Sequence, residues 1–419
     1  MNQITSSLAA AGPSALERFL RERLLRQLAP LRGGSLRVRD ALGEVLLGDP
    51  AGELQVGVTI DSPAFYRSVA AQGSVGAGEA YIRGDWWCDD LVGLVRLLVR
   101  NRDLLDGMER GPARLGGWLL RGWNRWRRNT RAGSRRNIAA HYDLGNDFFS
   151  LFLSADLMYS SALFAREDES LASASLRKLE RICRQLRLQP GDRVIEIGTG
   201  WGGFALHAAG HYGCHVTTTT ISAEQYALAC ERVAAAGLQD RVTVLQQDYR
   251  DLQGEYDKLV SIEMIEAIGA AYLDTYFATL GRLLRPGGLG LLQAITIEDH
   301  RYEQARRSVD YIKRFVFPGS FIPSLHAMLS AKTRASDLQL IDQHDFGQSY
   351  ALTLRAWRQR FLSQLPAVRA QGFDESFIRL WDFYLAYCEG GFLERAIGVS
   401  HLLLRRPGDV VVAATDEAG

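Results

Sequence analysis

Short apolar runs alternate with longer amphipathic segments through the second half of the chain. Runs rich in Val, Ile, Leu and Thr are typical of buried strands, and apolar residues recurring every three or four positions favour helices. This alternation predicts an α/β fold with a doubly wound parallel sheet, which binds ligands at the C-terminal ends of its strands. The predicted strands cover residues 193–198, 214–220, 242–248, 256–263, 289–296, 338–346 and 398–404. Predicted helices lie near residues 171–188, 202–212, 223–237 and 270–284, before a long helical region at 352–394.

The first predicted strand leads directly into a glycine-rich turn. Its residues Arg193–Ile197 place Glu196 near the strand end, and Gly198, Gly200 and Gly202 follow before an Ala-rich helix. Glycine lets the backbone turn tightly and lets a ligand approach the N–H groups, while the helix N-terminus favours an anionic group. The unit therefore predicts a ligand-binding cradle.

The residues around this turn bear on the kind of ligand. A dinucleotide site has the pattern G-x-G-x-x-G and an acidic residue at the end of the second strand. Here the spacing is G-x-G-x-G and the second strand, CHVTTTT, ends in hydroxyl groups, whereas acidic residues stand at Glu196 and at Asp248. S-adenosylmethionine, which has no pyrophosphate, suits this arrangement better than NAD or FAD. A turn that serves only helix packing is the remaining alternative.

Residues 1–109 form a smaller predicted α+β module. A helix is expected at residues 16–28, strands at 35–47 and 54–60, and a second helix at 91–99, after a glycine-spaced connection. Nothing in this module carries acid–base or metal chemistry.

A basic and aromatic linker is predicted at residues 110–140. The segment from 110 to 142 holds nine arginines and three tryptophans and no acidic residue. Aromatic rings interleaved with cations suit an anionic lipid surface, with the rings at headgroup level and the charges on the phosphates. Nucleic acid would accept the same chemistry, and a solvated linker is the third interpretation.

Composition bears on the partners of the protein and on its cellular compartment. A net charge of +1 gives the whole chain no attraction to nucleic acid, and five cysteines without C-x-x-C spacing are typical of a reducing compartment. The N-terminus lacks the pattern of a secretory signal, and no apolar run reaches the length of a membrane span. We therefore expect a cytoplasmic protein. No metal site is predicted, because Gly213 should end the helix that carries His207 and His211 and separate them from His215.

Five motifs occur together in a defined order: HYDLGNDFF, YSSALF, EIGTGWGG, TISAEQ and FVFPGSFIPS. With them, the chain resembles the cyclopropane-fatty-acyl-phospholipid synthase family of S-adenosylmethionine-dependent methyltransferases. The likeness runs from about His141 to the last strand, and residues 1–109 are similar, less distinctively, to the N-terminal module of longer members. It implies a seven-stranded, Rossmann-like class I methyltransferase domain at residues 141–407, with a helical insertion at 297–333 for the acyl chain.

The resemblance also implies how the cofactor is held. Tyr159 and Ser160 would contact the methionine end of S-adenosylmethionine, together with the three glycines of the turn. Glu196, just before the turn, is a further candidate for binding the cofactor. The nucleoside is expected at Thr220, Ile221, Gln225 and Asp248.

Bacterial members of this family hold a bicarbonate ion with a Cys, a Glu, a His and a Tyr, and that ion is thought to take up the proton. The matching positions here are Ser161, Glu266, Gln293 and Tyr350. Serine and glutamine also form hydrogen bonds. Plant-type members of the family are similar to this chain in having Glu-Ala at positions 266 and 267 and Gln at position 293. Bicarbonate therefore stays a candidate second cofactor.

The activity that the resemblance implies is methyl transfer to a cis double bond of a phospholipid acyl chain, followed by loss of a proton and closure of a cyclopropane ring. A methylene- or methyl-branched product from the same substrate is the alternative. A small-molecule methyltransferase and a membrane-binding module without activity are the rivals from other classes. The expected partner is unsaturated phospholipid at the inner face of the membrane, with no nucleic acid; the oligomeric state stays open, a homodimer included.

Overall fold

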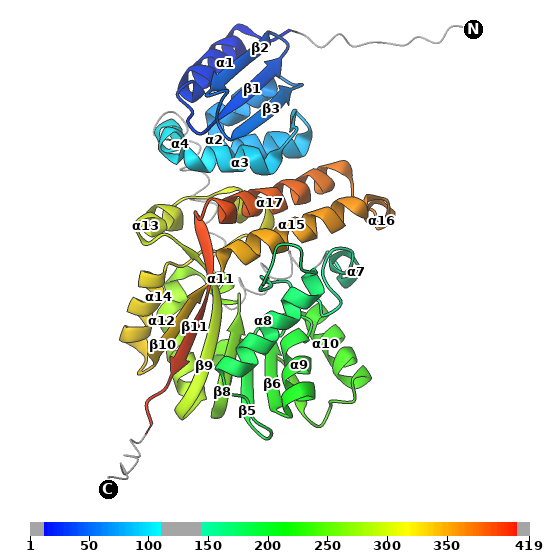
Figure 1. Ribbon diagram of the computed structural model, residues 1–419, viewed down its shortest axis with the longest axis vertical. Coiled ribbons are helices and arrows are strands. Elements are labelled where there is room, and N and C mark those ends of the chain that lie inside the picture. Colours follow the sequence, from blue (N-terminus) through cyan, green and yellow to red (C-terminus); the bar gives the residue numbers. More distant parts are fainter. Residues whose placement is uncertain (1–11, 110–143, 409–419) are drawn as a thin grey trace, which may run out of the picture. The chain divides into compact units, whose positions relative to one another are not determined.

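The computed structural model describes residues 12–109 and 144–408, which divide into two compact units (Figure 1). One unit contains residues 12–109 and 374–390, and the other contains 144–373 and 391–408. The predicted N-terminal module lacked residues 374–390, a segment that contains most of α17 (Glu375–Leu393). The predicted basic linker at 110–140 lies outside the described residues. No helix in the described ranges is both long and apolar enough to cross a bilayer.

The first unit is built on a four-stranded sheet with the order β2-β1-β3-β4. The segment predicted as one strand at residues 35–47 is a hairpin of two strands, and β1 also pairs with β3 in parallel. The glycine-spaced connection belongs to a helix, α2, which bends where Gly73 adopts a φ of +58°. The elements of this unit are α1 (Ala15–Leu28), β1 (Gly34–Asp40), β2 (Gly43–Gly48), β3 (Leu54–Ile60), α2 (Ala64–Arg83), β4 (Trp86–Cys88), α3 (Leu91–Arg100) and α4 (Arg102–Glu109).

The second unit contains the predicted seven-stranded sheet, with the order β10-β11-β9-β8-β5-β6-β7. The five strands from β9 to β7 pair in parallel. The sheet is mixed rather than parallel throughout, because β11 runs antiparallel to both β9 and β10. The strands are β5 (Arg193–Ile197), β6 (His215–Thr220), β7 (Val242–Gln246), β8 (Tyr256–Ile262), β9 (Leu284–Ile297), β10 (Gln339–Asp345) and β11 (Ile397–Arg405).

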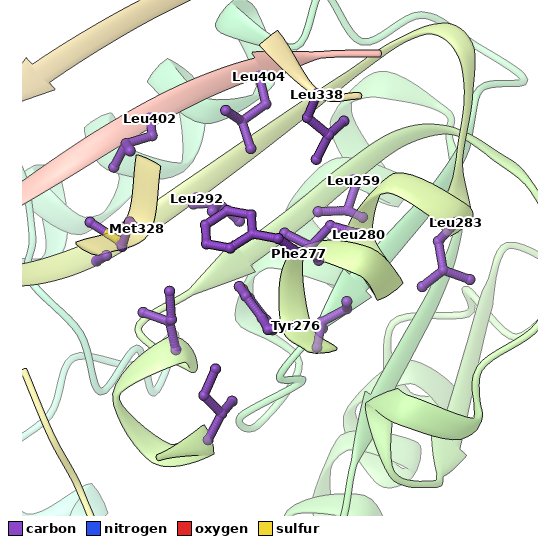
Figure 2. Packing of buried hydrophobic residues seen from close by; sticks show 14 of the residues in the cluster. Leu259, Tyr276, Phe277, Leu280, Leu283, Leu292, Met328, Leu338, Leu402 and Leu404 are labelled. Atoms are coloured by element: carbon purple, nitrogen blue, oxygen red, sulfur yellow. The ribbon is translucent and has the colours of Figure 1, made fainter. Parts of the chain in front are cut away.

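Both faces of this sheet are buried, which explains its continuous apolar runs. Val194 and Val260 pack with one group of helices, whereas their chain neighbours Ile195 and Leu259 pack with another. Successive side chains of a strand point to opposite faces, so each strand serves two cores. Figure 2 shows the second core, in which Phe277 lies among leucines of the sheet. The first face carries α8 (Leu171–Gln185), α9 (Gly203–Tyr212) and α10 (Ala223–Ala235), and the second α11 (Ile265–Ile268), α12 (Leu273–Leu283) and α14 (Leu325–Ala335) (Figure 1).

The predicted insertion at residues 297–333 divides into two parts. Its first part contains α13 (Asp299–Arg307) and a π-helical turn at Ile312–Val316. Its last part lies in α14, where Met328 and Ala331 are fully buried in the core beneath the sheet. Residues 325–333 therefore belong to the layer that covers the sheet.

The site lies where the order of the sheet reverses. The chain proceeds from β5 to β6 on one side and later places β8 on the other side of β5. In doubly wound sheets this point opens a crevice at the C-terminal ends of the strands, where ligands bind. The segment at residues 159–164 is fastened to α15 (Gly347–Ser363), because the N–H groups of Ala162 and Phe164 donate to the Thr353 and Ser349 hydroxyls.

Candidate active site

The glycine turn after β5 has the form of a backbone cradle. The N–H groups of Gly198 and Thr199 both donate to the Thr219 carbonyl at the end of β6, at 3.1 and 3.0 Å. Gly198 has a φ of +103°, which L side chains rarely adopt. A Cβ at Gly200 would meet no heavy atom within 4 Å. The turn is thus held from below and open above Gly200, which fits the methionine end of S-adenosylmethionine.

The end of β6 presents a chain of short polar contacts. The Thr220 hydroxyl donates to Oε1 of Gln225 at 2.8 Å and accepts from the Ser222 N–H at 3.1 Å. Ser222 caps α10, because its hydroxyl accepts from the Gln225 N–H. Since Thr220 occupies the amide oxygen, the NH₂ group of Gln225 remains the donor for a ligand. Ile221 lies half-buried between them.

Asp248 stands at the end of the neighbouring strand and is paired. Arg250 donates from Nε and Nη2 to the two carboxylate oxygens at 2.8 and 2.6 Å. The Arg250 guanidinium lies over the rings of Tyr249 and Tyr272. A nucleoside would therefore meet this carboxylate already fixed in one orientation.

Glu196 is buried beneath the cradle. Its carboxylate accepts from the Thr218 hydroxyl at 2.6 Å, and Thr218 in turn contacts the Thr199 hydroxyl at 2.7 Å. Burial raises the pKa of Glu196 to about 8, against this hydrogen bond and the charge of Lys178. The sequence predicted Glu196 as a cofactor contact; the structure places it one layer below the turn.

A fully buried lysine, which the sequence motifs did not reveal, lies beside the predicted methionine contacts. Lys178 of α8 donates from Nζ to the Ser160 hydroxyl at 2.7 Å. Burial lowers the pKa of Lys178 to about 8, and the negative charges of Glu263, Asp156 and Glu196 oppose this shift. Lys178 is therefore a buried amine close to the carboxyl groups of Glu263, Asp156 and Glu196 at the base of the site.

Aromatic rings enclose the neighbouring residue, Tyr159. Its ring lies 5.2 Å from Phe149 and 5.3 Å from Trp357, measured between ring centroids. Phe317, from the insertion, contributes another ring at 6.4 Å. These contacts give the site an apolar wall built from segments far apart in the sequence.

Three of the four predicted catalytic residues meet around one carboxylate, which belongs to Glu263. The Ser161 N–H and the Gln293 Nε2 donate to its Oε1 at 2.9 and 2.7 Å. The Tyr350 hydroxyl donates to its Oε2 at 2.7 Å. The Ser161 hydroxyl instead donates to the Ala162 carbonyl, so Ser161 contributes its backbone and not its side chain to this cluster.

Glu266, the fourth predicted catalytic residue, lies outside this hydrogen-bond network. Its Oε1 accepts from the Ile295 N–H at 2.6 Å, and its backbone carbonyl accepts from the Phe321 N–H. Burial raises the pKa of Glu266 to about 8, and the charge of Glu263 adds to the shift. Glu266 is thus a buried carboxyl that favours the neutral form at neutral pH.

The described residues contain no group of three or more His, Cys, Asp or Glu side chains placed to hold a metal ion. His207 and His211 stack on one another in α9, whereas His215 begins β6.

Comparison with known families matches residues 129–402 to the family described as mycolic acid cyclopropane synthetase. The chain belongs to this family. The resemblance to cyclopropane-fatty-acyl-phospholipid synthases is confirmed by such an enzyme from Escherichia coli, which is 36% identical over 85% of this chain and 89% of its own length. The tuberculostearic acid methyltransferase of Mycobacterium tuberculosis is 39% identical over 82% of each chain. As a family member, the protein is an S-adenosylmethionine-dependent methyltransferase.

Solved structures support the same assignment. A cyclopropane synthase of M. tuberculosis superposes with a TM-score of 0.61 and 27% identity, covering 65% of this chain and 98% of that one. A mycolic acid cyclopropane synthase solved with S-adenosylhomocysteine and CTAB gives the same values. The predicted class I methyltransferase fold is therefore confirmed.

Proposed function

We propose that this family member transfers a one-carbon unit from S-adenosylmethionine to the cis double bond of an unsaturated phospholipid acyl chain, forming a cyclopropane ring. The observation that carries the proposal is the partly buried, hydrogen-bonded carboxylate of Glu263, which lies near Lys178, the lysine that also contacts Ser160 of the predicted cofactor site. Such a site can accept a proton without exposing a reactive chain to water. The E. coli relative named as a fatty-acyl-phospholipid synthase supports the lipid class.

The chain's residues fit the cofactor in two places. The glycine turn with Tyr159 and Ser160 would receive the amino-acid end, and Thr220, Ile221, Gln225 and Asp248 would receive the nucleoside. When bound, S-adenosylmethionine supplies an electrophilic methyl group.

The protein's contribution to the chemistry is alignment and exclusion of water. An alkene is a weak nucleophile, so its approach has to be fixed by the apolar wall around Tyr159. Methylation leaves a carbocation on the acyl chain, and the position of the proton acceptor then selects the product. Aromatic faces such as Tyr311 and Phe315, 5.2 Å apart, can stabilise a nearby cation.

A methylene- or methyl-branched product is the second candidate. The relative that supports it is named as a tuberculostearic acid methyltransferase and is 39% identical to this chain. A hydride shift along the acyl chain before loss of a methyl proton would give the methylene product from the same substrate, and a saturated methyl branch would in addition require a hydride donor to reduce that double bond. Ring formation requires that the proton leave the new methyl group itself.

We further propose that the enzyme works in the cytoplasm, on the inner face of the membrane. The arginines and tryptophans of residues 110–140 would hold it on anionic phospholipid. Sedimentation with anionic and with neutral vesicles tests this, and binding should weaken as salt is raised. The protein is also proposed to form a homodimer, which a measurement of its molar mass in solution by light scattering tests.

Product analysis tests the function itself. The protein is incubated with vesicles of a monounsaturated phospholipid and S-adenosylmethionine labelled with ¹³C in the methyl group. Mass spectrometry and NMR of the recovered acyl chains then separate a ring from a branch. If the recovered acyl chains carry no ¹³C although calorimetry shows that the cofactor binds, the result would favour a small-molecule methyltransferase. Absence of cofactor binding would favour a membrane module without activity.

A further inference from the structure

Three of the four residues expected to bind bicarbonate already donate hydrogen bonds to a side chain of the protein. Ser161, Gln293 and Tyr350 direct hydrogen-bond donors at one point, as an anion site requires, but that point is the Glu263 carboxylate. We propose that Glu263 itself accepts the proton in the reaction and that this enzyme works without bicarbonate. The inference rests on the proposed function and names the base within the same site.

The donors stabilise the ionised form of Glu263, which is the form that a base needs. A backbone N–H and an amide NH₂ can only donate, so Oε1 of Glu263 has to be an acceptor. The Tyr350 hydroxyl completes the set at Oε2. A carboxylate offers two acceptor positions on each oxygen, and these donors use three of the four. The fourth, on Oε2, is the position for an incoming proton.

The backbone at Glu263 is held in an unusual conformation. Its φ is +48°, a left-handed value that is uncommon for a residue other than glycine. The Glu263 N–H donates to the Gln293 carbonyl at 2.8 Å, which locks this turn at the end of β8. Such strain costs about 1 to 3 kcal/mol and persists where the surrounding structure over-determines it. Here it aims the carboxylate at the three donors.

A bicarbonate ion does not fit beside this arrangement. It would have to share the donors with a carboxylate of the same charge, and two like charges held by the same donors repel each other. The nearby cation is Lys178, which also faces Glu196 and Asp156. One internal carboxylate can be balanced in this setting, whereas a second anion would have to take the donors of Ser161, Gln293 and Tyr350 away from Glu263.

The step balances with no further reactant. After methyl transfer, Oε2 of Glu263 takes a proton from the new methyl group, and the C–H electron pair closes the third carbon–carbon bond of the ring. If a hydride has first shifted along the chain, the same oxygen takes the methyl proton and the pair forms a methylene double bond. Glu263 ends the step neutral and returns the proton to water when the product leaves. Burial raises the pKa of Glu263, against the bonds from Tyr350, Ser161 and Gln293, which makes it a better base.

Two substitutions of Glu263 give opposite responses to added anion. Glu263→Gln fills the same space without a base, and its rate should fall about 10²- to 10⁴-fold whether or not bicarbonate is present. Glu263→Gly removes the side chain at a backbone position that suits glycine, so this variant should fold. It leaves the three donors around an open space, and added bicarbonate should restore part of its activity.

The assays use the full-length protein in buffer freed of carbon dioxide, with and without added bicarbonate. Wild-type protein should be equally active in both, as should the control Glu255→Gln, the same change at an exposed position. Calorimetry of S-adenosylmethionine binding shows that each variant is folded. A wild-type rate that depends on bicarbonate, or an active variant at position 263 without it, would overturn the proposal. Wild-type protein that methylates no lipid would instead overturn the proposed function.

Discussion

The Nε2 atom of His401 lies 3.0 Å from Oε1 of Gln293, and the two residues face each other in the register of β9 and β11. Both side chains are buried. Burial lowers the pKa of His401 well below its usual range, so the ring is neutral and carries a single N–H. Because the amide oxygen accepts from this N–H, the NH₂ group of Gln293 has to point at Glu263. His401 is thus a positioning residue.

Replacing His401 should slow the reaction without weakening substrate binding. His401→Leu removes the donor and leaves the Gln293 oxygen buried without a partner, at a cost of about 1 to 3 kcal/mol. The amide then loses its fixed orientation, and we expect kcat to fall about tenfold with KM nearly unchanged. His401→Gln, which can still donate, should recover much of the rate. Equal losses in the two variants would contradict the positioning role.

Lys178 should act on the cofactor through Ser160. With Lys178 donating to its oxygen, the Ser160 hydroxyl has its hydrogen available for the carboxylate of the cofactor. Lys178→Met should weaken S-adenosylmethionine binding about tenfold, measured by calorimetry, because it removes both this orientation and a positive charge. A double-mutant cycle with Ser160→Ala gives the coupling between the two residues. Fully additive effects would show that Lys178 does not act through Ser160.

The fold was largely predictable, because buried strands and glycine turns leave clear patterns. The strands from β5 to β9 were predicted from their apolar runs, which reflect a sheet covered on both faces. The direction of β11 was not, since an apolar run does not encode which way a strand pairs. Helix α2 was missed because glycines interrupt it. One of them, Gly76, is required by packing, since a Cβ there would lie 2.0 Å from the Ser68 carbonyl oxygen.

The site was predictable in its parts and not in its arrangement. Ser161, Gln293 and Tyr350 were found through the resemblance to the family, but the sequence EMIE directly after β8 contains two glutamates, Glu263 and Glu266. Glu263 meets the three donors because its backbone adopts a left-handed conformation. Side-chain types do not predict such a conformation for a residue other than glycine. Lys178 was missed for a related reason: a lysine in an amphipathic helix usually faces solvent. Its burial depends on partners far away in the sequence.

Thr220 should set the affinity of the nucleoside site. Thr220→Val keeps the shape of the side chain but removes the bond that orients the Gln225 amide. It also leaves the Ser222 N–H without its acceptor. We expect S-adenosylmethionine to bind about tenfold more weakly, in line with the loss of one or two hydrogen bonds. Thr220→Ser is the matched control and should bind as the wild type does; a Val variant of unchanged affinity would exclude the role.

Glu266 should make the stability of the enzyme fall as pH rises. Its pKa is about 8 in the folded protein, whereas the ordinary glutamate pKa of 4.5 applies in the unfolded chain. Below pH 4.5 both states carry the proton, and the contribution of Glu266 to stability is fully present. Between these values only the folded state holds the proton, so the free energy of unfolding should lose up to about 1.4 kcal/mol per pH unit.

Glu266→Gln tests this linkage, because the amide cannot ionise and its oxygen can still accept from the Ile295 N–H. Urea unfolding of both proteins between about pH 5 and pH 8 should show the wild type losing stability relative to the variant as pH rises. The difference should level off above about pH 8, where the folded carboxyl ionises as well. An exposed substitution, Glu231→Gln, should give a curve parallel to that of the wild type. If the free energy of unfolding of Glu266→Gln depends on pH in the same way as that of the wild type, then Glu266 is ionised in the folded protein. Its charge must in that case be stabilised by a contact other than the Ile295 N–H.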